Sequence, residues 1–280
     1  MIIYIQVVIY NKEMVNSSTL SSLCAQSNKC VYGQSIILNI HDNTKLPCFD
    51  NSVIEKLQKK YKVIYEHTPE NRTLRDIYNN RIDNLNADDI LLLLDDDSSL
   101  PENFIDTLYS DAQKYNSVNL FAPRVIVNDK LYSPYKSYSF ISKPLFDLQQ
   151  GMIPCSNHAF INSGLAIRGR FFIDTGFRYP PSVEFYGTDT VFSHIYRQRQ
   201  SVYLLMNLDI RHNVNNHPEN FDTKRYAGAL SKVMQFWYAN LHGLSKVVYL
   251  LYMLIYMIKL TVKSRSLIFF KMFMGLKYND

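Results

Sequence analysis

Glycine and cysteine are scarce in this chain, and their scarcity limits the kinds of site it can hold. Only nine of the 280 residues are glycine, and the loop after the first apolar segment, Val8–Lys12, contains none. The chain therefore has no glycine-rich phosphate loop at that place. The four cysteines show neither a CxxC pair nor zinc-type spacing, which argues against a zinc site and predicts reduced thiols in a cytoplasmic protein.

Long hydrophobic runs and a strong charge of one sign are missing as well. No stretch reaches the ~20 apolar residues that span a bilayer, and residues 1–10 lack the basic start and cleavage site of a signal peptide. The net charge, +5 from 30 basic and 25 acidic residues, is small and dispersed, so nucleic acid is not an expected partner. A hydrophobic share of 47% is ample for a core, and 280 residues suffice for one large domain or for a domain with an appendage.

Short apolar runs alternate with amphipathic stretches through the first half of the chain. Strands are expected at residues 2–10, 35–40, 61–65, 90–94, 120–127 and 202–210, and helices at 17–25, 53–60, 74–85, 101–115 and 189–199. This alternation predicts an α/β fold with a mostly parallel central sheet flanked by helices. Residues 129–154, rich in Tyr, Ser, Pro and Lys, are expected to form a long loop or a partly mobile flap.

Three consecutive carboxylates, Asp95, Asp96 and Asp97, follow the apolar run Leu91–Leu94. A buried strand that ends in acids presents charge at the carboxyl edge of a sheet, where ligands bind. Adjacent carboxylates raise one another's pKa unless a cation lies among them, and their hard oxygens suit Mg²⁺ or Mn²⁺. The alternative is a solvated acidic turn that caps a helix starting at Pro101.

The C-terminal segment, residues 241–280, differs in kind from the rest. Val247–Ile258 is nearly all apolar, with tyrosines on one side of a helical projection, aliphatic residues on another, and lysines around it. This pattern is typical of an amphipathic helix that lies in a membrane interface. The alternative is an apolar helix that packs on its own domain or on a second subunit, as in a homodimer.

Six segments in order, between about residues 2 and 240, resemble the family 2 glycosyltransferases, which have the GT-A fold. The segments are Val8–Lys12, Ile37–Thr44, Asn71–Asn79, Leu94–Asp97, Asn162–Phe177 and Gly187–Asp189. The resemblance implies a GT-A domain over residues 1–240, with a nucleotide-sugar-binding half (1–127) and an acceptor half (128–240), followed by a membrane-associating tail (241–280). Thr188 departs from the family pattern, which has glutamate before the catalytic aspartate, and leaves open whether Glu184 or Asp174 assists.

The resemblance also implies a divalent metal, Mn²⁺ or Mg²⁺, and its ligands. Asp97 would bind it directly, Asp95 would hold the ribose or support the metal, and His212 would be a further ligand, with His217 as its competitor. On an extended backbone the side chain of Asp96 points away from its two neighbours. Asp95 and Asp97 should therefore matter for catalysis much more than Asp96.

The remaining implied roles concern catalysis and the two substrates. Asp189 would be the base that takes the acceptor proton, with inversion at the anomeric carbon; Asp189 would equally serve as the N-cap of a helix starting at Thr190. The implied donor-binding residues are Tyr10, Asn11, Asp42, Asn71, Arg75, Asp95 and Asp96, and the implied acceptor-side residues are Asn162, Ser163 and Gly164.

The function that the resemblance implies is transfer of one sugar (hexosyltransferase type) from a nucleotide-diphosphate sugar to a glycan or lipid-linked acceptor. Gln235–Asn240, followed by the apolar tail, resembles the rhamnosyltransferase-like branch of bacterial surface-polysaccharide enzymes, and the QxxRW motif of processive synthases is missing. The expected place is the cytoplasm, peripheral on the inner face of the cell membrane. The alternatives are a sugar nucleotidyltransferase, which the glycine-free Val8–Lys12 loop disfavours, and a non-catalytic membrane-associated scaffold, which the retained acids disfavour.

Overall fold

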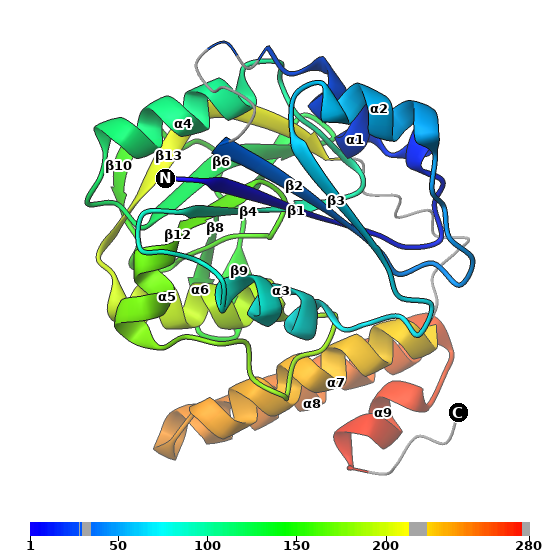
Figure 1. The fold of residues 1–280 in the computed structure, drawn as a ribbon. Coiled ribbons are helices and arrows are strands. Elements are labelled where there is room, and N and C mark those ends of the chain that lie inside the picture. Colours follow the sequence, from blue (N-terminus) through cyan, green and yellow to red (C-terminus); the bar gives the residue numbers. More distant parts are fainter. Residues whose placement is uncertain (28, 30–34, 213–222, 276–280) are drawn as a thin grey trace.

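A ten-stranded sheet runs through the middle of the molecule, in a computed structural model that describes residues 1–27, 29, 35–212 and 223–275 (Figure 1). Its main path runs β10-β13-β6-β12-β4-β1-β2-β3, with β5 paired to β13 and β7 paired to β6. The strands of this path are β1 (Ile3–Ile9), β2 (Ile36–Asp42), β3 (Lys62–His67), β4 (Ile90–Asp95), β6 (Leu120–Val127), β10 (Gly151–Pro154), β12 (Leu165–Arg168) and β13 (Val202–His212).

The expected α/β fold is confirmed, and two strands of the main path, β12 and β10, run against the direction of the others. β3, β2, β1 and β4 are all parallel, as alternating strands and helices predict. β12 then lies antiparallel between β4 and β6, and β10 lies antiparallel to β13. The sheet is therefore mixed: β3, β2, β1 and β4 form one parallel group, and β6 and β13 pair parallel to each other beyond β12.

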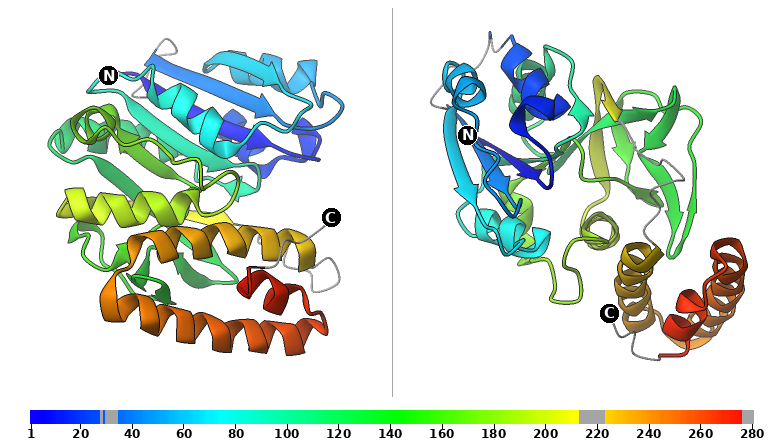
Figure 2. Two further views of the ribbon diagram at one scale, coloured as in Figure 1. Left: turned by 90° about the horizontal axis from the view of Figure 1, so that it is seen from below. Right: turned by 90° about the vertical axis from the view of Figure 1, so that its right-hand side faces the viewer.

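Helices cover both faces of this sheet (Figures 1 and 2). One face carries α1 (Ser18–Ala25), α2 (Asn51–Gln58) and α4 (Phe104–Lys114), and the other carries α3 (Leu74–Ile82), α5 (Gly169–Thr175) and α6 (Thr188–Arg199). Three helices begin at a side-chain cap: Ser17 accepts from Leu20 N, Asp50 from Ser52 N, and Thr73 from Asp76 N. The chain also forms a short 3₁₀ turn, η1 (Met14–Asn16).

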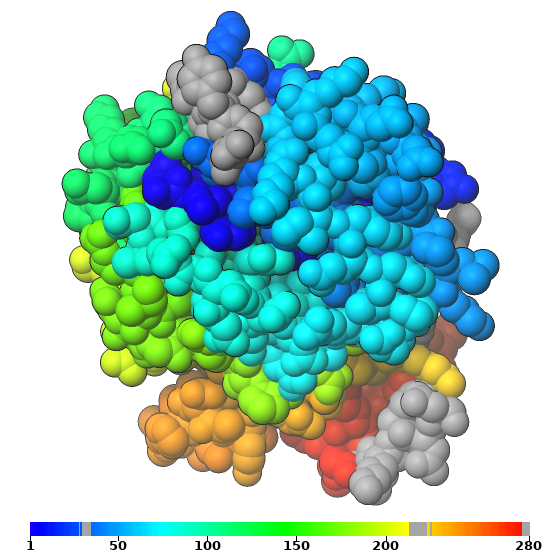
Figure 3. Space-filling model, viewed as in Figure 1, coloured from blue at the N-terminus to red at the C-terminus, as the bar shows by residue number. Residues whose placement is uncertain are grey.

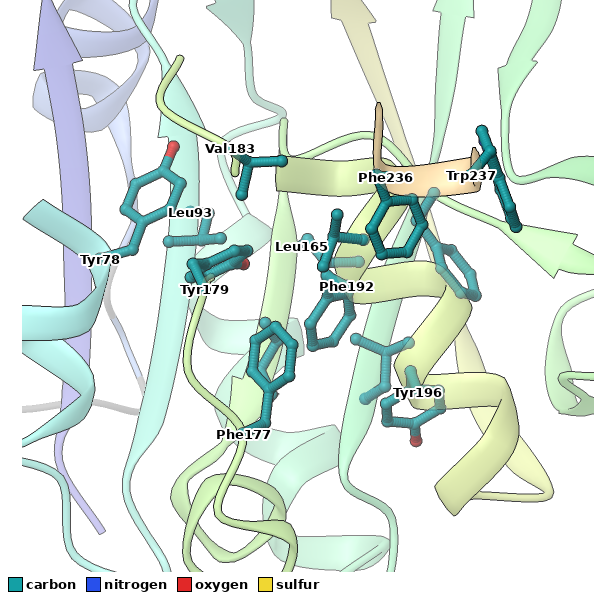
Figure 4. Packing of buried hydrophobic residues seen from close by; sticks show 14 of the residues in the cluster. Tyr78, Leu93, Leu165, Phe177, Tyr179, Val183, Phe192, Tyr196, Phe236 and Trp237 are labelled. Atoms are coloured by element: carbon teal, nitrogen blue, oxygen red, sulfur yellow. The ribbon is translucent and has the colours of Figure 1, made fainter. Parts of the chain in front are cut away.

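The apolar run before the acids is buried on both sides because successive strand residues face opposite ways. Leu92 and Leu94 join the core beneath α1, α2 and α4, whereas Leu91 and Leu93 join the core on the opposite face. Figure 4 shows part of the second core, where Leu93 and Leu165 of the sheet lie near rings such as Phe192 of α6. Strand β4 is thus the centre of the molecule, and its position is fixed up to Asp95.

Helix α4 begins at Phe104 and not at Pro101. Its apolar side faces the core, where Phe104, Ile105, Leu108 and Ala112 are all buried. The residues before it form a two-residue strand, β5 (Ser98–Ser99), which pairs with the end of β13. The acid triplet therefore does not cap a helix, and that alternative is wrong.

The loop expected at residues 129–154 is wrong. The segment forms β7 (Lys130–Ser133), β8 (Tyr135–Tyr138), β9 (Ile141–Lys143) and β10, and a further strand, β11 (His158–Ala159), joins β8 and β9 in a small three-stranded sheet. These strands are only two to four residues long, so none shows a clear hydrophobic period. Pairing with neighbours supplies the order that the local sequence does not.

Three further helices, α7 (Thr223–Asn240), α8 (Gly243–Ser264) and α9 (Ile268–Phe273), lie along one edge of the molecule (Figures 1 and 3). Phe236 and Trp237 of α7 pack into the second core, and α8 lies on the outer side of α7 (Figure 2). The sequence predicted no segment long and apolar enough to span a bilayer. This prediction is wrong for α8, whose 22 residues are long and apolar enough to cross a membrane, by length and composition only.

Candidate functional site

The acid triplet lies at the carboxyl edge of the central sheet, where β4 ends. Asp95 is the last residue of β4, and Asp97 lies in the turn that leads to β5. Pairing of Ser98 with His212 places the end of β13 beside this turn. As a result, ligand atoms of Asp95, Asp97 and His212 all lie within 4.8 Å of one another. The fold thus brings together the three predicted metal-ligating residues, although His212 follows Asp97 by 115 positions in the chain.

The two carboxyl groups of this cluster are partly buried, which disfavours their charged forms. Burial raises the pKa of both Asp95 and Asp97, and the nearby His212 opposes the rise. Asp97 Oδ1 is buried and, among the described residues, has no hydrogen-bond partner; His212 Nδ1 lies 3.3 Å from it. A buried acceptor without a donor is costly. Two carboxylates and an imidazole fit a divalent cation of the Mn²⁺ or Mg²⁺ type, and such a cation would give Asp97 Oδ1 a partner.

Two side-chain hydroxyls from the N-terminal part of the chain bind the backbone at the end of β4. Thr19 Oγ1 donates to the Asp95 carbonyl at 2.5 Å, and Ser17 Oγ donates to the Asp96 carbonyl at 2.8 Å. The Asp96 side chain turns to Lys12, whose Nζ lies 2.5 Å from Oδ1. Asp96 thus has a partner outside the cluster. Its expected contact with the donor stays a prediction.

Asp189 lies in the first turn of α6, close to the acid cluster. The helix begins at Thr188 after Gly187, so the expected helix start at Thr190 with Asp189 as its N-cap is wrong. Gly187 has φ +83°, and a Cβ on it would lie 2.9 Å from Val233 Cγ2, so glycine is required there. Asp189 Oδ1 accepts from Thr190 N at 2.7 Å.

The electrostatics of Asp189 suit a proton acceptor near neutral pH. Burial raises its pKa to about 6, against the lowering effect of the Thr190 hydrogen bond, and the charge of Asp95 raises it further. A carboxylate with such a pKa is mostly ionised at pH 7 and still basic enough to take a proton. The predicted base and the predicted metal ligands therefore act on each other electrostatically.

The turn Asn162–Gly164 links these two parts of the site. Ser163 Oγ donates to Asp95 Oδ2, and Asn162 Nδ2 donates to Thr188 Oγ1 at 2.9 Å. Gly164 has φ +84°, and a Cβ on it would lie 2.3 Å from Ile210 Cδ1. These residues were predicted as acceptor-side groups. Their hydrogen bonds to β4 and α6 were not predicted, because no local sequence pattern indicates such a link.

Asp42, at the end of β2, is completely buried. Burial alone would raise its pKa, but hydrogen bonds outweigh that effect and lower it to about 2. The donors are Thr44 N at 2.9 Å, Cys48 N at 2.8 Å and Tyr65 Oη at 2.5 Å. Asp42 therefore holds the loop that follows β2 in shape. Its expected contact with a nucleotide base stays a prediction.

The other predicted donor residues lie in loops around the same end of the sheet, except Arg75, which lies in the first turn of α3. Tyr10 is 41% exposed directly after β1, and Asn11 and Asn71 have left-handed backbones with φ +52° and +57°. Arg75 Nε donates to Asp76 Oδ1 at 2.8 Å, and its backbone N donates to Glu184 O at 3.1 Å. Arg75 thus connects α3 to the segment before α6. His217, the competitor of His212, lies outside the described residues.

Comparisons with known proteins agree with this geometry. A family model described as "Glycosyl transferase family 2" matches residues 4–176. No curated protein matches the sequence.

Among solved structures, S. aureus TarS has a TM-score of 0.57 and 12% identity over 89% of this chain and 42% of TarS. An N-terminal TarS fragment in complex with UDP-GlcNAc has a TM-score of 0.55 and 11% identity over 89% of this chain and 70% of the fragment. GalNAc-T7 with UDP, GalNAc and Mn²⁺ has a TM-score of 0.61 and 14% identity over 83% of this chain and 47% of that chain.

The chain thus spans less than half the length of TarS and GalNAc-T7. At such low identity the structural likeness shows the GT-A fold alone. The family model, which covers more than half of the sequence, goes further. The chain belongs to glycosyl transferase family 2.

Proposed function

We propose that the chain is a metal-dependent glycosyltransferase of the hexosyltransferase type. It moves one sugar from a nucleotide-diphosphate sugar to a hydroxyl of a glycan or lipid-linked acceptor. The observation that carries this proposal is the convergence of Asp95, Asp97 and His212 within 4.8 Å, next to a base, Asp189, whose pKa is about 6. A neighbour solved with UDP, GalNAc and Mn²⁺ supports the choice of metal and donor.

The acid cluster would hold the metal. Asp97 and His212 contribute one ligand atom each, and Asp95 contributes its carboxylate while Ser163 holds that carboxylate in place. Bound Mn²⁺ or Mg²⁺ supplies charge neutralisation for the departing nucleoside diphosphate. Tyr10, Asn11, Asp42, Asn71, Arg75 and Asp96 would surround the donor, which makes residues 1–127 the nucleotide-sugar-binding half.

Asp189 would activate the acceptor in the second half, residues 128–240. Its carboxylate takes the proton of the acceptor hydroxyl while that oxygen forms a bond to the anomeric carbon. The bond from this carbon to the diphosphate oxygen breaks, and the electron pair leaves with the diphosphate. Attack from the opposite face inverts the configuration. Asn162, Ser163 and Gly164 lie on this side, and they set the position of Asp189 relative to Asp95.

The tail, residues 241–280, would place the enzyme beside a lipid-borne acceptor. One side of α8 packs inward through Tyr249, Met253 and Met257. The other side exposes aliphatic side chains, among them Leu244 (79% exposed), Ile255 (69%) and Val262 (73%). Here the "apolar face" means the exposed side chains of Leu244, Val247, Val248, Leu251, Ile255, Ile258 and Val262.

Charge favours a lipid surface as the occupant of this apolar face. Residues 223–279 hold nine lysines and arginines and no aspartate or glutamate. An apolar stripe with a basic surround is attracted to anionic headgroups and buries its aliphatic groups among acyl chains. We therefore propose a peripheral place on the inner face of a bacterial cell membrane and a role in surface-polysaccharide synthesis, in the rhamnosyltransferase-like branch. A homodimer through the same face is the competing occupant.

Release of nucleoside diphosphate from a panel of nucleotide sugars, with Mn²⁺ present, tests the proposed activity. Wild-type protein is expected to turn over one or two donors, and Asp97→Ala is expected to abolish that turnover. Equal release by both proteins would refute the metal assignment. No turnover of any donor by the wild type, with and without glycan acceptors, would refute the proposed activity itself.

A further inference from the structure

A cavity lies beside Asp189, and the mechanism proposed above does not use it. Its volume is about 100 Å³, and it opens between the β8–β9 hairpin, α6 and α7. We call it the serine cavity. Its lining includes Tyr135, Ser137, Phe140, Ser142, Thr190 and Trp237.

The lining combines hydroxyl groups with aromatic rings and carries no charge. Ser137, Ser139, Ser142, Thr190 and Tyr135 supply five hydroxyls, and Phe140, Tyr135 and Trp237 supply rings. Hydroxyls both donate and accept, and flat rings pack well against the C–H face of a pyranose. A phosphate or carboxylate would need a cation, and none of the lining residues is Lys, Arg or His. The chemistry therefore matches a neutral sugar.

The size of the serine cavity agrees with this ligand. About 10–15 Å³ of such volume holds one water, so the cavity takes roughly seven. That space fits a single sugar ring with its substituents and is too small for a nucleotide. By contrast, the cavity under α3, lined by Asn39, His41 and Arg81, measures about 10 Å³ and has room for about one water only.

The serine cavity adjoins the base through Thr190. The Thr190 amide donates to Asp189 Oδ1 at 2.7 Å, and the Thr190 hydroxyl lies 3.4 Å from the same oxygen. On the opposite wall, burial raises the pKa of Tyr135, and the charge of the nearby Asp189 raises it further. A sugar in this cavity would therefore contact Thr190, the residue next to Asp189, whose carboxylate takes the proton.

Trp237 gives the cavity a rigid wall. It is 4% exposed, and His194 of α6 packs edge-on against it with ring centroids 4.9 Å apart. Figure 4 shows Trp237 beside Phe236 at the margin of the aromatic core. The opposite wall is the hairpin, where Ser137 Oγ donates to Ser139 O at 3.1 Å. A fixed ring facing a strand edge with hydroxyls is a preformed site.

We propose that the serine cavity binds one neutral pyranose unit of the acceptor and holds its reacting hydroxyl toward Asp189. The assignment rests on the proposed glycosyl transfer, which it deepens by naming a sugar, and not a bare lipid or protein, as the group next to the bond that forms. A lipid-linked acceptor would then carry at least one sugar before this enzyme acts.

The single tryptophan of the chain is Trp237, so its fluorescence reports directly on the serine cavity. The full-length protein is titrated with methyl glycosides of glucose, galactose, N-acetylglucosamine and rhamnose, and separately with inorganic pyrophosphate. The same titrations are run on the double variant Ser137→Ala/Ser142→Ala. The matched control is Tyr138→Phe, because Tyr138 lies between the same serines in the hairpin but is 44% exposed and does not line the cavity.

A saturable change with at least one methyl glycoside is expected in the wild type and in Tyr138→Phe. The double variant should need at least about tenfold more glycoside for half-saturation, since it loses two hydrogen-bonding groups. No response to any glycoside, a response to pyrophosphate alone, or equal responses in the double variant would each overturn the assignment.

Donor turnover without acceptor separates this result from the proposed function. Donor turnover without any response to a glycoside would refute sugar binding in the serine cavity and support the transferase activity. A glycoside response in a protein that turns over no donor would refute the transferase activity and support sugar binding in the cavity.

Discussion

The end of β4 and the outer side of α8 depart in opposite ways from the usual distribution of polar and apolar groups. At the end of β4, the carboxyl groups are partly buried, and one buried oxygen, Asp97 Oδ1, has no hydrogen-bond partner among the described residues. On α8, large aliphatic side chains are up to 79% exposed. Most of the remaining chain follows the ordinary rule, with two apolar cores separated by the sheet.

The comparison teaches what each region requires from outside the chain. Burial of a carboxylate and exposure of an apolar patch both lower the stability of an isolated protein. A divalent cation would relieve the first region, and a lipid surface would relieve the second. The two needs are independent, because β4 lies in the centre of the sheet and α8 at the edge of the molecule (Figure 1). Substitutions should therefore separate them.

Among the substitutions that separate the two regions, the largest effect is expected for Asp189→Asn. Loss of the base should lower the rate of transfer to acceptor by about 10³-fold, since general-base catalysis contributes roughly 10²–10⁴. The fold should persist: a pKa raised to about 6 means that the ionised carboxylate destabilises the native state at pH 7. Thermal unfolding at pH 7 should show an equal or higher midpoint in the variant. A transfer rate within threefold of wild type would contradict the role of Asp189.

The second effect concerns the apolar face alone. The triple variant Val247→Ser/Leu251→Ser/Ile255→Ser should bind anionic vesicles about 100-fold more weakly, since each side chain loses roughly 1 kcal/mol of burial in the membrane. Donor hydrolysis in solution should not change. The readout is co-sedimentation with vesicles of phosphatidylglycerol and phosphatidylcholine.

The control for the apolar face is Leu46→Ser, a side chain 76% exposed in the first half of the chain. It should bind vesicles as the wild type does. Equal vesicle binding by the triple variant would refute the lipid contact. A triple variant that turns from dimer to monomer in light scattering, with vesicle binding unchanged, would assign the face to a second copy of the chain.

The third effect is a pH dependence that belongs to the site and not to the tail. With a pKa of about 6, Asp189 is mostly ionised at pH 7 and mostly protonated at pH 5, so transfer at limiting acceptor should fall about tenfold between these values. The stability that the protonated form contributes is fully present below pH about 4 and is lost as pH rises through about 6. A flat profile from pH 5 to 7, with folding intact by circular dichroism, would contradict the assignment.

The smallest effect is expected for Asp96→Asn. Asp96 pairs with Lys12, and both side chains stay partly exposed, at 17% and 27%, so loss of this ion pair costs about 1 kcal/mol. Donor turnover should therefore change by no more than about fivefold. Lys12→Met removes the same ion pair from its other end and should give a similar value. A loss as large as that of Asp97→Ala would show that the triplet acts as a unit.

The sequence predicted the first half of the fold better than the second for a physical reason. Strands β1 to β4 are buried on both faces, and their apolar runs are visible without knowledge of partners. Strands β7 to β11 are two to four residues long and owe their order to pairing, so their sequence reads as a loop. The exposed side of α8 was visible in its composition, but the full length of the helix was not.

The site shows the same division. The convergence of Asp95, Asp97 and His212 was predicted by likeness to a family, since no local pattern joins residues as far apart as Asp97 and His212, which are separated by 115 positions. The structural duties of Asp42 and of Ser163 were missed because each depends on a partner distant in the chain, Tyr65 in one case and Asp95 in the other. The electrostatic neighbourhood of Asp189 likewise arises only from the folded sheet edge.

Metal binding at the end of β4 is the central claim, and a titration with Mn²⁺ followed by electron paramagnetic resonance tests it most directly. The signal of free Mn²⁺ is measured with wild-type protein and with Asp97→Asn, each with and without UDP. We expect one Mn²⁺ per wild-type chain, tighter binding with UDP, and at least about tenfold weaker binding in Asp97→Asn, which loses one charged ligand. Equal Mn²⁺ binding by the two proteins would contradict metal binding by Asp97 at the end of β4.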